Sequence, residues 1–425
     1  MQTTDVLEEL HWRGLVAQHT DGVPGALKAG PVSAYIGFDP TGSSLHVGSL
    51  VVIMILVHLQ RHGHRPIALV GGGTGMIGDP SGKVNERQLL SDEQVSANVE
   101  SIRTQLERFL SFDGPSAARM RNNADWLTTL PLVEFLRDTG KHFTVNYMLQ
   151  KDSVSRRLES EDGISYTEFS YLILQSYDFL QLFDRHNCTF QMGGSDQWGN
   201  ITAGTDLIRK VRGQKAHGLV WPLLKTSSGT KFGKTEAGTV WLDPERTSPF
   251  RFYQFWLNTD DRDVISHLKL FTWLDRETVD AIQRTVTEKP EAREAQRTLA
   301  REVTTMVHGA TELARAERAS AVLFGGPLAD ASVEDVLMVF ADVPAVTLPR
   351  SAFEPGIAAT ELAVTAGIAA SKGEAARLIK QGGLSVNDRK LTDERGVITF
   401  DQAFGGQLFV IRKGRRQTHV VRMAD

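Results

Sequence analysis

The chain has 425 residues, of which 41% are hydrophobic and 23% charged, a composition typical of a globular protein of two to four domains. Its net charge of -4 excludes a polycation, so any contact with nucleic acid must come from a local patch. Cys188 is the only cysteine, which excludes an internal disulfide and a cysteine-rich zinc site. We find neither a secretory signal nor an apolar run of membrane-spanning length, and therefore expect a cytoplasmic protein with no membrane contact.

Residues 34–49 predict a strand, a loop of small residues and the start of a helix. We expect this helix to begin near Leu45 and to carry His46 in its first turn. Unpaired amides and the helix dipole at such a start attract anions. The residues that follow, 50–57, are apolar all round, which predicts a helix that is covered on most sides.

A second strand, over residues 66–70, runs directly into a glycine-rich stretch, 71–83. Strand, helix and strand at this spacing predict a right-handed crossover in a parallel sheet, whose loops open on one edge. The spacing of a Walker loop is absent, and a flexible turn is the alternative. Asp79, Lys83 and Arg87 favour a binding role, because they bring a carboxylate and two cations to that edge.

Residues 90–150 have a helical pattern and are too long for a simple crossover, so they predict an inserted segment. Its aromatic and apolar side chains either cover a partner subunit or close the core of their own domain. A further helix is expected over 165–183, where Tyr171, Gln175 and Asp178 share one face. Because the helix is otherwise apolar, this polar stripe needs partners, although Asp178 reaching solvent or an arginine is the simpler alternative.

Residues 190–200 repeat the pattern of a strand, a glycine-rich loop and a helix. Asp196 in this loop is suited to accept from sugar hydroxyls, and Gln197 to donate to a carboxylate. The stretch 226–239 has no hydrophobic period and predicts a mobile loop. Its lysines, Lys231 and Lys234, either carry charge onto a polyphosphate or are simply solvated.

The remaining third of the chain changes in composition. Residues 248–325 are helical in pattern, and 326–357 contain four prolines and predict a linker. A small module over 358–425 is basic: from Lys372 to Arg422 it has eleven Lys and Arg against five Asp and Glu. Such a compact patch is typical of contact with a phosphate backbone, with a solubilising tail as the alternative.

Three blocks of the sequence match a known family. The stretch Pro40 to Ser49 resembles the first class I signature, HIGH, and Lys231 to Thr235 (KFGKT) resembles the second, KMSKS. Residues 191–200, together with the polar face of the 165–183 helix, resemble an amino-acid pocket. Over essentially its whole length the chain resembles the bacterial-type tyrosyl-tRNA synthetases, which are class I aminoacyl-tRNA synthetases.

The resemblance implies an α/β fold in which a Rossmann-like parallel-sheet catalytic domain precedes an α-helical domain and a small α+β RNA-binding module. The implied domains are the catalytic domain 1–225 with its helical insertion at about 90–150, the signature loop 226–247, an anticodon-recognition domain 248–325, the linker 326–357 and the ribosomal-protein-type module 358–425. It also implies a homodimer, with 120–150 as the likeliest surface.

The implied reaction has two steps. Tyrosine attacks ATP to give tyrosyl-adenylate and pyrophosphate, and tRNA(Tyr) then takes the tyrosyl group. L-tyrosine, ATP and tRNA are thus substrates, Mg²⁺ is expected with ATP, and no permanent cofactor or protein-held metal is implied. Catalysis would consist of positioning and charge stabilisation, without a covalent nucleophile.

Site roles follow from the matching positions. The residues expected to act on the phosphates are Thr41, His46, Lys83, Arg87, Lys231, Lys234 and Thr235. Tyrosine would be held by Tyr35, Asp79, Tyr171, Gln175, Asp178 and Gln197, with Tyr35 and Asp178 on the phenol. ATP would contact Gly37, Asp39, His46, Gly48, Ser49, Gly194, Asp196 and Lys234, and RNA would contact Arg377, Lys380, Arg412, Lys413, Arg415 and Arg416.

The sequence departs from the family pattern at Ser49, which replaces the second histidine of HIGH, and the KFGKT form lacks the Met and Ser of KMSKS. Three other readings compete with a tyrosine enzyme. A tryptophanyl enzyme would not need the phenol-binding pair Tyr35 and Asp178. Another HxGH-type adenylyltransferase would need neither the helical domain nor the basic module, and a non-catalytic RNA-binding relative would not need the signature residues.

Overall fold

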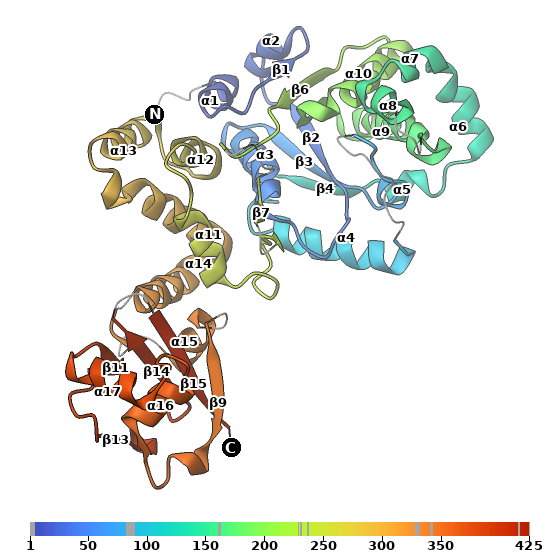
Figure 1. The fold of residues 1–425 in the computed structure, drawn as a ribbon. Helices are drawn as coiled ribbons and strands as arrows, with labels where there is room; N and C mark the ends of the chain where they lie inside the picture. Colours follow the sequence, from blue (N-terminus) through green and yellow to red (C-terminus); the bar gives the residue numbers. More distant parts are fainter. Residues whose placement is uncertain are drawn as a thin grey trace. The chain divides into compact units, whose positions relative to one another are not determined.

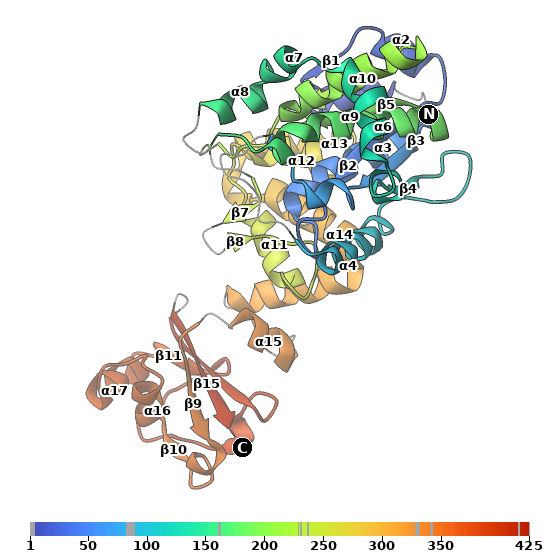
Figure 2. The same cartoon turned by 90° about the vertical axis from the view of Figure 1, so that its right-hand side faces the viewer.

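The structure, a computed structural model, divides the chain into two compact units (Figure 1, and from a second side Figure 2). It describes residues 5–81, 90–159, 163–227, 229, 232–235, 238–324, 326–328, 332–340, 343–414 and 417–424. Unit 1 comprises Met1–Thr247 and Asn258–Leu299, and unit 2 comprises Ser248–Leu257 and Ala300–Asp425.

Unit 1 is built around a six-stranded sheet with the strand order β1-β6-β5-β2-β3-β4. The strands are β1 (Gln18–His19), β2 (Ser33–Phe38), β3 (Arg65–Val70), β4 (Arg119–Asn122), β5 (Cys188–Gly194) and β6 (His217–Trp221). All neighbouring pairs are parallel except β1 and β6. The chain runs from β2 outward through β3 and β4 and then returns to the other side of β2 as β5. Ligands of open α/β sheets bind at such a reversal, beyond the carboxyl ends of the strands.

Helices cover both faces of this sheet. Tyr35, Ile67 and Leu69 share one apolar core with α9 (Tyr166–His186) and α10 (Trp198–Arg212). Because side chains alternate along a strand, the neighbours of these residues point to the other face, where α3 (Leu50–Arg61) packs. The other helices of unit 1 include α2 (Val23–Lys28), α4 (Asp92–Leu106), α5 (Ala124–Leu127), α6 (Leu132–Asp138), α7 (Val145–Leu149), α8 (Asp152–Leu158) and α13 (Arg276–Glu288).

The predicted burial of α3 is confirmed, but its predicted start near Leu45 is wrong. A 3-10 turn, Val47–Ser49, precedes α3, and His46 is the extended N-cap of that turn, not a residue of the first helical turn. The stretch stays extended because it pairs with a distant segment. The amide of Val47 donates to the carbonyl of Val240 (3.0 Å), and that of Leu242 to the carbonyl of Leu45 (2.9 Å).

The segment 90–150 is not wholly helical, which corrects the sequence prediction. It contains β4, which pairs with β3 at the edge of the sheet. The sequence of β4, RMRN, lacks an apolar alternation because charged residues are tolerated on an edge strand. Trp126, only 4% exposed, closes the core of its own unit, whereas Leu132 and Val133 are 69% and 74% exposed.

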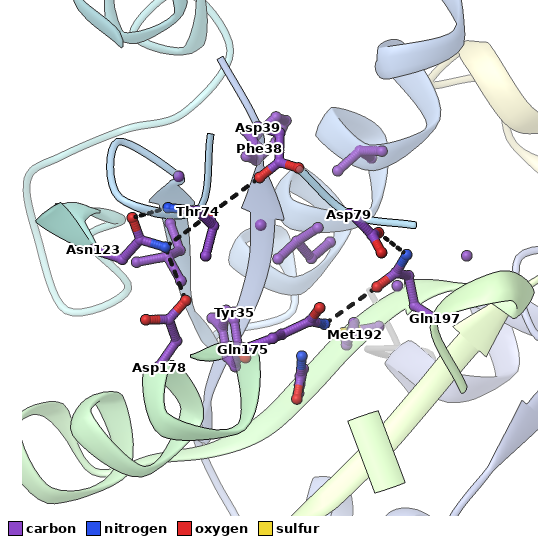
Figure 3. Close-up of a pocket in the computed structure, with 18 of the residues that line it drawn as sticks. Tyr35, Phe38, Asp39, Thr74, Asp79, Asn123, Gln175, Asp178, Met192 and Gln197 are labelled. Carbon is purple, nitrogen blue, oxygen red and sulfur yellow. Dashed lines mark hydrogen bonds between the residues drawn. The ribbon is translucent and has the colours of Figure 1, made fainter. Parts of the chain in front are cut away.

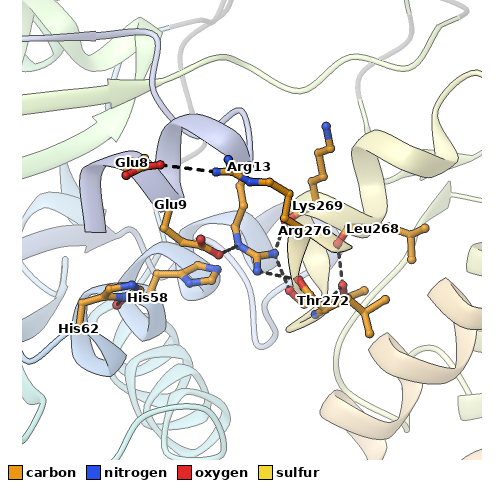
Figure 4. A network of polar contacts seen from close by, with 10 residues as sticks. Glu8, Glu9, Arg13, His58, His62, Leu268, Lys269, Thr272 and Arg276 are labelled. Atoms are coloured by element: carbon orange, nitrogen blue, oxygen red, sulfur yellow. Dashed lines mark hydrogen bonds and ion pairs between the residues drawn. The ribbon is translucent and has the colours of Figure 1, made fainter. Parts of the chain in front are cut away.

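Within unit 1, hydrogen bonds from Arg13 connect the N-terminal helix to the helices that follow residue 258 (Figure 4). It lies at the end of α1 (Val6–Trp12), is 4% exposed, and donates to the carbonyls of Lys269 (2.7 Å) and Thr272 (2.9 Å). Glu9 accepts from its Nε at 2.7 Å. Arg13 thus satisfies carbonyls that the end of α12 (Val264–Phe271) leaves unpaired. The helices expected over 248–325 therefore do not form one unit.

Unit 2 contains α11 (Pro249–Leu257), most of α14 (Glu294–Leu323) and a five-stranded sheet with the order β12-β11-β14-β15-β9. Its strands are β12 (Arg389–Lys390), β11 (Leu384–Val386), β14 (Leu408–Lys413), β15 (Gln417–Ala424) and β9 (Ala345–Pro349). The helices α16 (Ala359–Thr365) and α17 (Lys372–Lys380) and the short strands β10 (Ile357–Ala358) and β13 (Val397–Ile398) complete it. The predicted α/β fold with a small C-terminal α+β module is confirmed.

The prediction of a linker over 326–357 is wrong. This segment contains α15 (Val333–Val339) and β9, which pairs in parallel with β15. Pro349 ends an edge strand, where a missing amide removes no bond that the sheet needs. Val336 and Val339 of α15 pack into the core of unit 2, so the segment is part of the folded module.

Candidate active site

A cavity of about 230 Å³ opens at the carboxyl ends of β2 and β5, where the strand order reverses (Figure 3). The six residues predicted for tyrosine and three of those predicted for ATP line it together. They are Tyr35, Asp79, Tyr171, Gln175, Asp178 and Gln197, with Gly37, Asp39 and Gly194. They come from β2, β5, α9 and the loops after β2, β3 and β5, so all of these elements contribute to one cavity.

Asp178, on α9, marks one end of the cavity and is only 2% exposed. Its carboxylate accepts from Nδ2 of Asn123 (2.9 Å) and from Nε1 of Trp126 (2.7 Å). Burial raises the pKa of Asp178 to about 7, although these two hydrogen bonds oppose the rise. The hydroxyl of Tyr35 is buried and has no partner among the described residues. Burial, and then the nearby Asp178, raise the pKa of Tyr35 well above 10, so it is a neutral phenol. This end offers two polar groups to a ligand hydroxyl.

The other end of the cavity carries a chain of amides that leads to a carboxylate. Gln197 donates from Nε2 to Asp79 at 2.6 Å and accepts from Gln175 at 3.2 Å. Asn200 donates to the Oε1 atoms of Gln175 (3.0 Å) and Gln197 (3.2 Å). Asp79 is in turn fixed by the amide of Ser81 (2.9 Å). Acceptor atoms thus gather where a ligand ammonium group can be held.

A second chain runs from the Asp178 end along the side of the cavity to Asp39 and Tyr171. The hydroxyl of Tyr171 lies 3.3 Å from the carboxylate of Asp39, and Thr74 donates to the same carboxylate at 3.3 Å. Asn123 donates to Thr74 at 2.9 Å as well as to Asp178. The residues are therefore held by one another before any ligand is bound, which is the preorganisation that binding sites require.

Sequence reasoning missed Thr74 and Asn123, and it gave Gln191 and Met192 no role of their own within the block 191–200. Asn123 directly follows β4, a strand that the hydrophobic pattern of the sequence does not indicate. A polar residue directly after a strand is the usual signal of such a site, and without the strand this signal could not be recognised. Gln191 is 2% exposed, and its Oε1 has no partner among the described residues. Its position as a polar residue in an apolar strand was the available signal, and in the sheet it is the register partner of Tyr35 on β2.

The first signature is a rigid turn in which Ser49 has a clear structural place. The amide of Gly48 donates to Nδ1 of His46 (3.0 Å), and the amide of His46 donates to the hydroxyl of Ser49 (3.4 Å). Since Nδ1 accepts, the proton of the neutral imidazole is on Nε2, which is a donor. A Cβ at position 48 would stand 2.8 Å from the imidazole, so only glycine leaves the ring in this position.

The second signature docks on the first through its Phe-Gly centre. Phe232 is 5% exposed, and its ring lies against Phe271 and His267 of α12, with centroids 5.2 Å and 4.9 Å away. Gly233 has φ +85°, and a Cβ there would come within 2.9 Å of Val47. These contacts explain the Phe and Gly of KFGKT. Phe232 is an apolar anchor, and position 233 needs glycine because its φ is positive and because it closely approaches Val47.

The predicted phosphate-binding cations are described only in part. Lys83, Arg87 and Lys231 lie outside the described residues. For Lys234 and Thr235 the structure gives the backbone, as β7 (Lys234–Thr235) paired with β8 (Gly238–Thr239). Thr41 lies in the exposed part of the loop after β2.

Asp196 does not line the first cavity but a neighbouring one of about 530 Å³. Gly194, which lines the first, is close to it: a Cβ at position 194 would come within 2.6 Å of the carboxylate of Asp196. Lys151, Arg156 and Arg157 also line the second cavity. A ligand that contacts Gly194 and Asp196 together would therefore extend from one cavity toward the other.

The six predicted RNA contacts of the C-terminal module divide into different groups. Arg412 is 8% exposed and donates to Asp388 (2.6 Å) and to the carbonyl of Val322 (2.9 Å). Its assignment as an RNA contact is wrong, because along β14 its side chain points to the protein interior. Arg377 and Lys380 are exposed on α17, and Lys413, 31% exposed, pairs with Glu374. Arg415 and Arg416 lie outside the described residues.

Comparisons with known proteins agree with this geometry. Residues 27–325 match the family model described as tRNA synthetases class I (W and Y), and residues 335–421 match that of a tyrosine–tRNA ligase SYY-like C-terminal domain. A tyrosine–tRNA ligase of Roseiflexus castenholzii is 55% identical over 99% of this chain and 100% of its own. That of Rhodopirellula baltica is 48% identical over 100% of this chain and 97% of its own.

Among solved structures, a C-terminally truncated mitochondrial tyrosyl-tRNA synthetase of Aspergillus nidulans superposes with a TM-score of 0.69. It is 30% identical, and the match covers 76% of this chain and 94% of that one. The resemblance stated from the motifs is confirmed, and the tryptophanyl alternative is not favoured, since the C-terminal model is that of tyrosine enzymes.

Proposed function

Since the chain belongs to the tyrosine–tRNA ligases, a family of class I tRNA synthetases, we propose that the cavity at the carboxyl edge of its sheet joins tyrosine to ATP. The chain attaches L-tyrosine to tRNA at the expense of ATP, in a reaction of two steps of which the first consumes the ATP. One observation carries the proposal for the site. A single cavity has a buried hydroxyl and a buried carboxyl at one end, and a group of ammonium acceptors at the other.

Tyrosine fits between these two ends. Its phenol reaches Tyr35 and Asp178, and its ammonium group lies among Asp79, Tyr171 and Gln175, with Gln197 beside its carboxylate. Phenylalanine would leave the buried hydroxyl of Tyr35 without a partner and would bring no donor to Asp178, and an unsatisfied buried group costs about 1–3 kcal/mol. The phenol end therefore selects tyrosine.

ATP lies with its ribose at Gly194 and Asp196, its adenine against Gly48 and its phosphates at the first signature, near Gly37 and Asp39. Nε2 of His46 donates to the phosphates, since Nδ1 is occupied by the amide of Gly48. Ser49 acts through the turn, because its hydroxyl holds the amide of His46.

In the first step the carboxylate oxygen of tyrosine bonds to the α-phosphorus, and the bond from that phosphorus to the pyrophosphate oxygen breaks. Thr41, Lys83, Arg87, Lys231, Lys234 and Thr235 stabilise the charge that develops on the leaving pyrophosphate. In the second step a terminal ribose hydroxyl of tRNA attacks the acyl carbon and AMP leaves. No side chain forms a covalent bond, so the protein works by positioning and charge.

Exchange of labelled pyrophosphate into ATP tests this function directly. We expect exchange that depends on tyrosine and is absent with tryptophan, because the adenylate forms reversibly only when the phenol fills the buried end. Phenylalanine is the control for the phenol contact alone. Exchange supported by tryptophan and not by tyrosine, or by neither, would rule the proposal out.

Mg²⁺ is expected to accompany ATP, bound by its phosphates and by water. Among the described residues no group of three or more His, Cys, Asp or Glu side chains is placed to hold a metal ion. Within the same described part of the chain, no helix combines the length and apolarity needed to cross a membrane. A cytoplasmic location stays a prediction.

We also propose a homodimer, in which α6 and α7 form the contact. Their exposed apolar side chains are Leu132 (69%), Val133 (74%), Leu136 (45%), Val145 (60%) and Leu149 (37%). A contiguous apolar patch on a soluble protein is typical of an interface. A two-fold axis places the same patch on both copies, so each apolar side chain contributes twice.

Val133→Asp should convert the dimer to monomers. Burying one valine contributes about 1.5–3 kcal/mol and two copies lose it, so the dissociation constant should rise about 100-fold or more. Sedimentation velocity over a range of concentrations measures this. Val397→Asp, which changes an equally apolar residue that is 51% exposed in unit 2, is the control and should leave the dimer intact. A dimer of unchanged affinity in Val133→Asp would place the interface elsewhere.

The helices after residue 248 and the C-terminal module are the proposed tRNA-binding parts, with anticodon recognition by the helices. In the module, Arg377 and Lys380 on α17 and Lys413 on β14 are the exposed cations that support this role, whereas Arg412 supports the fold. The division into these functional domains is a proposal, and the loop 226–247 is proposed to close on the phosphates.

A further inference from the structure

The sheet of unit 1 has a second recess, at the edge opposite the catalytic cavity. It has a volume of about 370 Å³ and lies where β2, β3, β4 and β5 begin. Its lining residues are Pro31, Val32, Ser33, Arg65, Arg119, Arg185, His186, Asn187 and Thr189. Since β2 is six residues long, its two ends are roughly 20 Å apart. The recess is therefore distinct from the cavity for tyrosine and ATP.

Four cationic or titratable groups meet there, and they come from three separate elements. Arg65 begins β3, Arg119 begins β4, and Arg185 and His186 end α9. The dipole of α9 accounts for a cation at its own C-terminus, but it does not account for the arginines at the starts of two strands. The tertiary fold thus concentrates positive charge that no single element requires.

This charge is not neutralised within the described part of the chain. None of the described residues that line the recess is acidic, and Arg65, Arg119 and Arg185 form no ion pair with a described residue. Among the described residues, Arg65 donates to the carbonyl of Pro115 (3.3 Å) and pairs with no carboxylate.

The hydrogen bond and the lowered pKa of His186 also indicate an excess of positive charge at this recess. Its Nε2 accepts from Arg121 at 2.9 Å, which requires a neutral ring. Partial burial, followed by Arg121, Arg119 and Arg185, lowers the pKa of His186. Neutral donors stand beside the cations, namely the side-chain amide of Asn187 and the hydroxyl of Thr189. Planar guanidinium groups with neutral donors around a concave space are the usual complement of a phosphate group.

We propose that this recess binds a small phosphate-bearing anion with several negative charges, independently of the catalytic cavity. A small anion is favoured over the backbone of an RNA because the cations line a recess and not an extended groove. Bound phosphate oxygens would accept from Arg65, Arg119 and Arg185 and would lower the mutual repulsion of these groups.

Inorganic tripolyphosphate is a suitable probe, titrated calorimetrically into the full-length protein while a non-hydrolysable tyrosyl-adenylate analogue fills the catalytic cavity. We expect binding to the wild type, and binding at least about tenfold weaker in Arg65→Gln/Arg119→Gln, because two charged contacts are lost. Arg185 is left in place because its guanidinium lies 5.7 Å from the ring of Trp126, which contacts Asp178. Arg103→Gln/Arg108→Gln, which removes the same charge from exposed positions, should bind as the wild type does.

A second measurement locates the bound anion. Tripolyphosphate should raise the pKa of His186, followed by NMR of ¹³C-labelled histidine, with His186→Gln to identify the signal. No binding by the wild type, equal binding by Arg65→Gln/Arg119→Gln, or an unmoved His186 titration would each overturn the proposal. Loss of tRNA affinity in the arginine variant without any binding of tripolyphosphate would also overturn it, and would assign the arginines to RNA.

Discussion

Asp178→Asn should lower kcat/KM for tyrosine activation by about 10–150-fold, which corresponds to the 1.5–3 kcal/mol of a hydrogen bond to a charged group. In the proposed site the carboxylate accepts from the substrate phenol, and in the structure it is held by Asn123 and Trp126. An asparagine side chain has one acceptor oxygen for both of these donors, so its amide group must face one of them. Activation of phenylalanine, which has no phenol hydroxyl, should change far less, and selectivity should fall by nearly the same factor. Pyrophosphate exchange with each amino acid measures both values.

Asp184→Asn is the matched control, because Asp184 lies on the same helix and pairs with Arg212 at the surface. It should leave both activities near those of the wild type.

The pH dependence of tyrosine binding is a further control. Because burial raises the pKa of Asp178 to about 7, the carboxylate is increasingly protonated below that pH and loses acceptor capacity. The KM for tyrosine in the wild type should therefore rise as pH falls below about 7, and in Asp178→Asn this rise should be absent. A selectivity unchanged by Asp178→Asn would remove Asp178 from the phenol contact.

Lys234→Ala should slow formation of tyrosyl-adenylate by about 100–1,000-fold, the usual effect of removing one preorganised donor from a developing charge. The neighbouring Phe232 is buried against α12, and Gly233 touches the first signature turn at Val47. We propose that this docking brings the next residue, Lys234, to the phosphates of ATP. The affinity for tyrosine alone should stay within about twofold, since the tyrosine contacts lie elsewhere. Single-turnover kinetics with ATP separates the two values.

Lys215→Ala removes the same charge from an exposed loop and should leave the rate unchanged. Phe232→Ala gives a second view of the loop, because it removes the anchor and keeps both lysines. It should slow the same step as Lys234→Ala without weakening tyrosine binding. A normal rate of adenylate formation in Lys234→Ala would show that the charge of this lysine does not act on the phosphates.

Much of the catalytic cavity could be predicted from the sequence, because it is assembled from local patterns that parallel sheets repeat. A strand that ends in small and polar residues places them at the carboxyl edge, and this applies to Gly37 on β2 and to Gly194 on β5. Helical periodicity places Tyr171, Gln175 and Asp178 on one face. All three line the same cavity, and α3 is buried as its apolar sequence predicts.

Other parts of the cavity depended on contacts between distant segments. Asn123 and Trp126 follow an edge strand without an apolar pattern, so nothing local indicated that they would reach Asp178. The helix start was misplaced for a similar reason, because pairing with residues 240–242 keeps the residues before Val47 extended.

By itself, the sequence determined the fold class, because periodicity and turn residues are local properties of the chain, and its motifs identified the family. Only the tertiary structure decided which partner each polar group has. Arg412 and Lys413 are adjacent and both cationic, yet one is buried against Val322 and the other is partly exposed. The same holds for Asp178, whose pKa is set by burial and by donors from distant segments. A side chain's charge is encoded locally, whereas its solvation and its hydrogen bonds are created only when distant segments pack together.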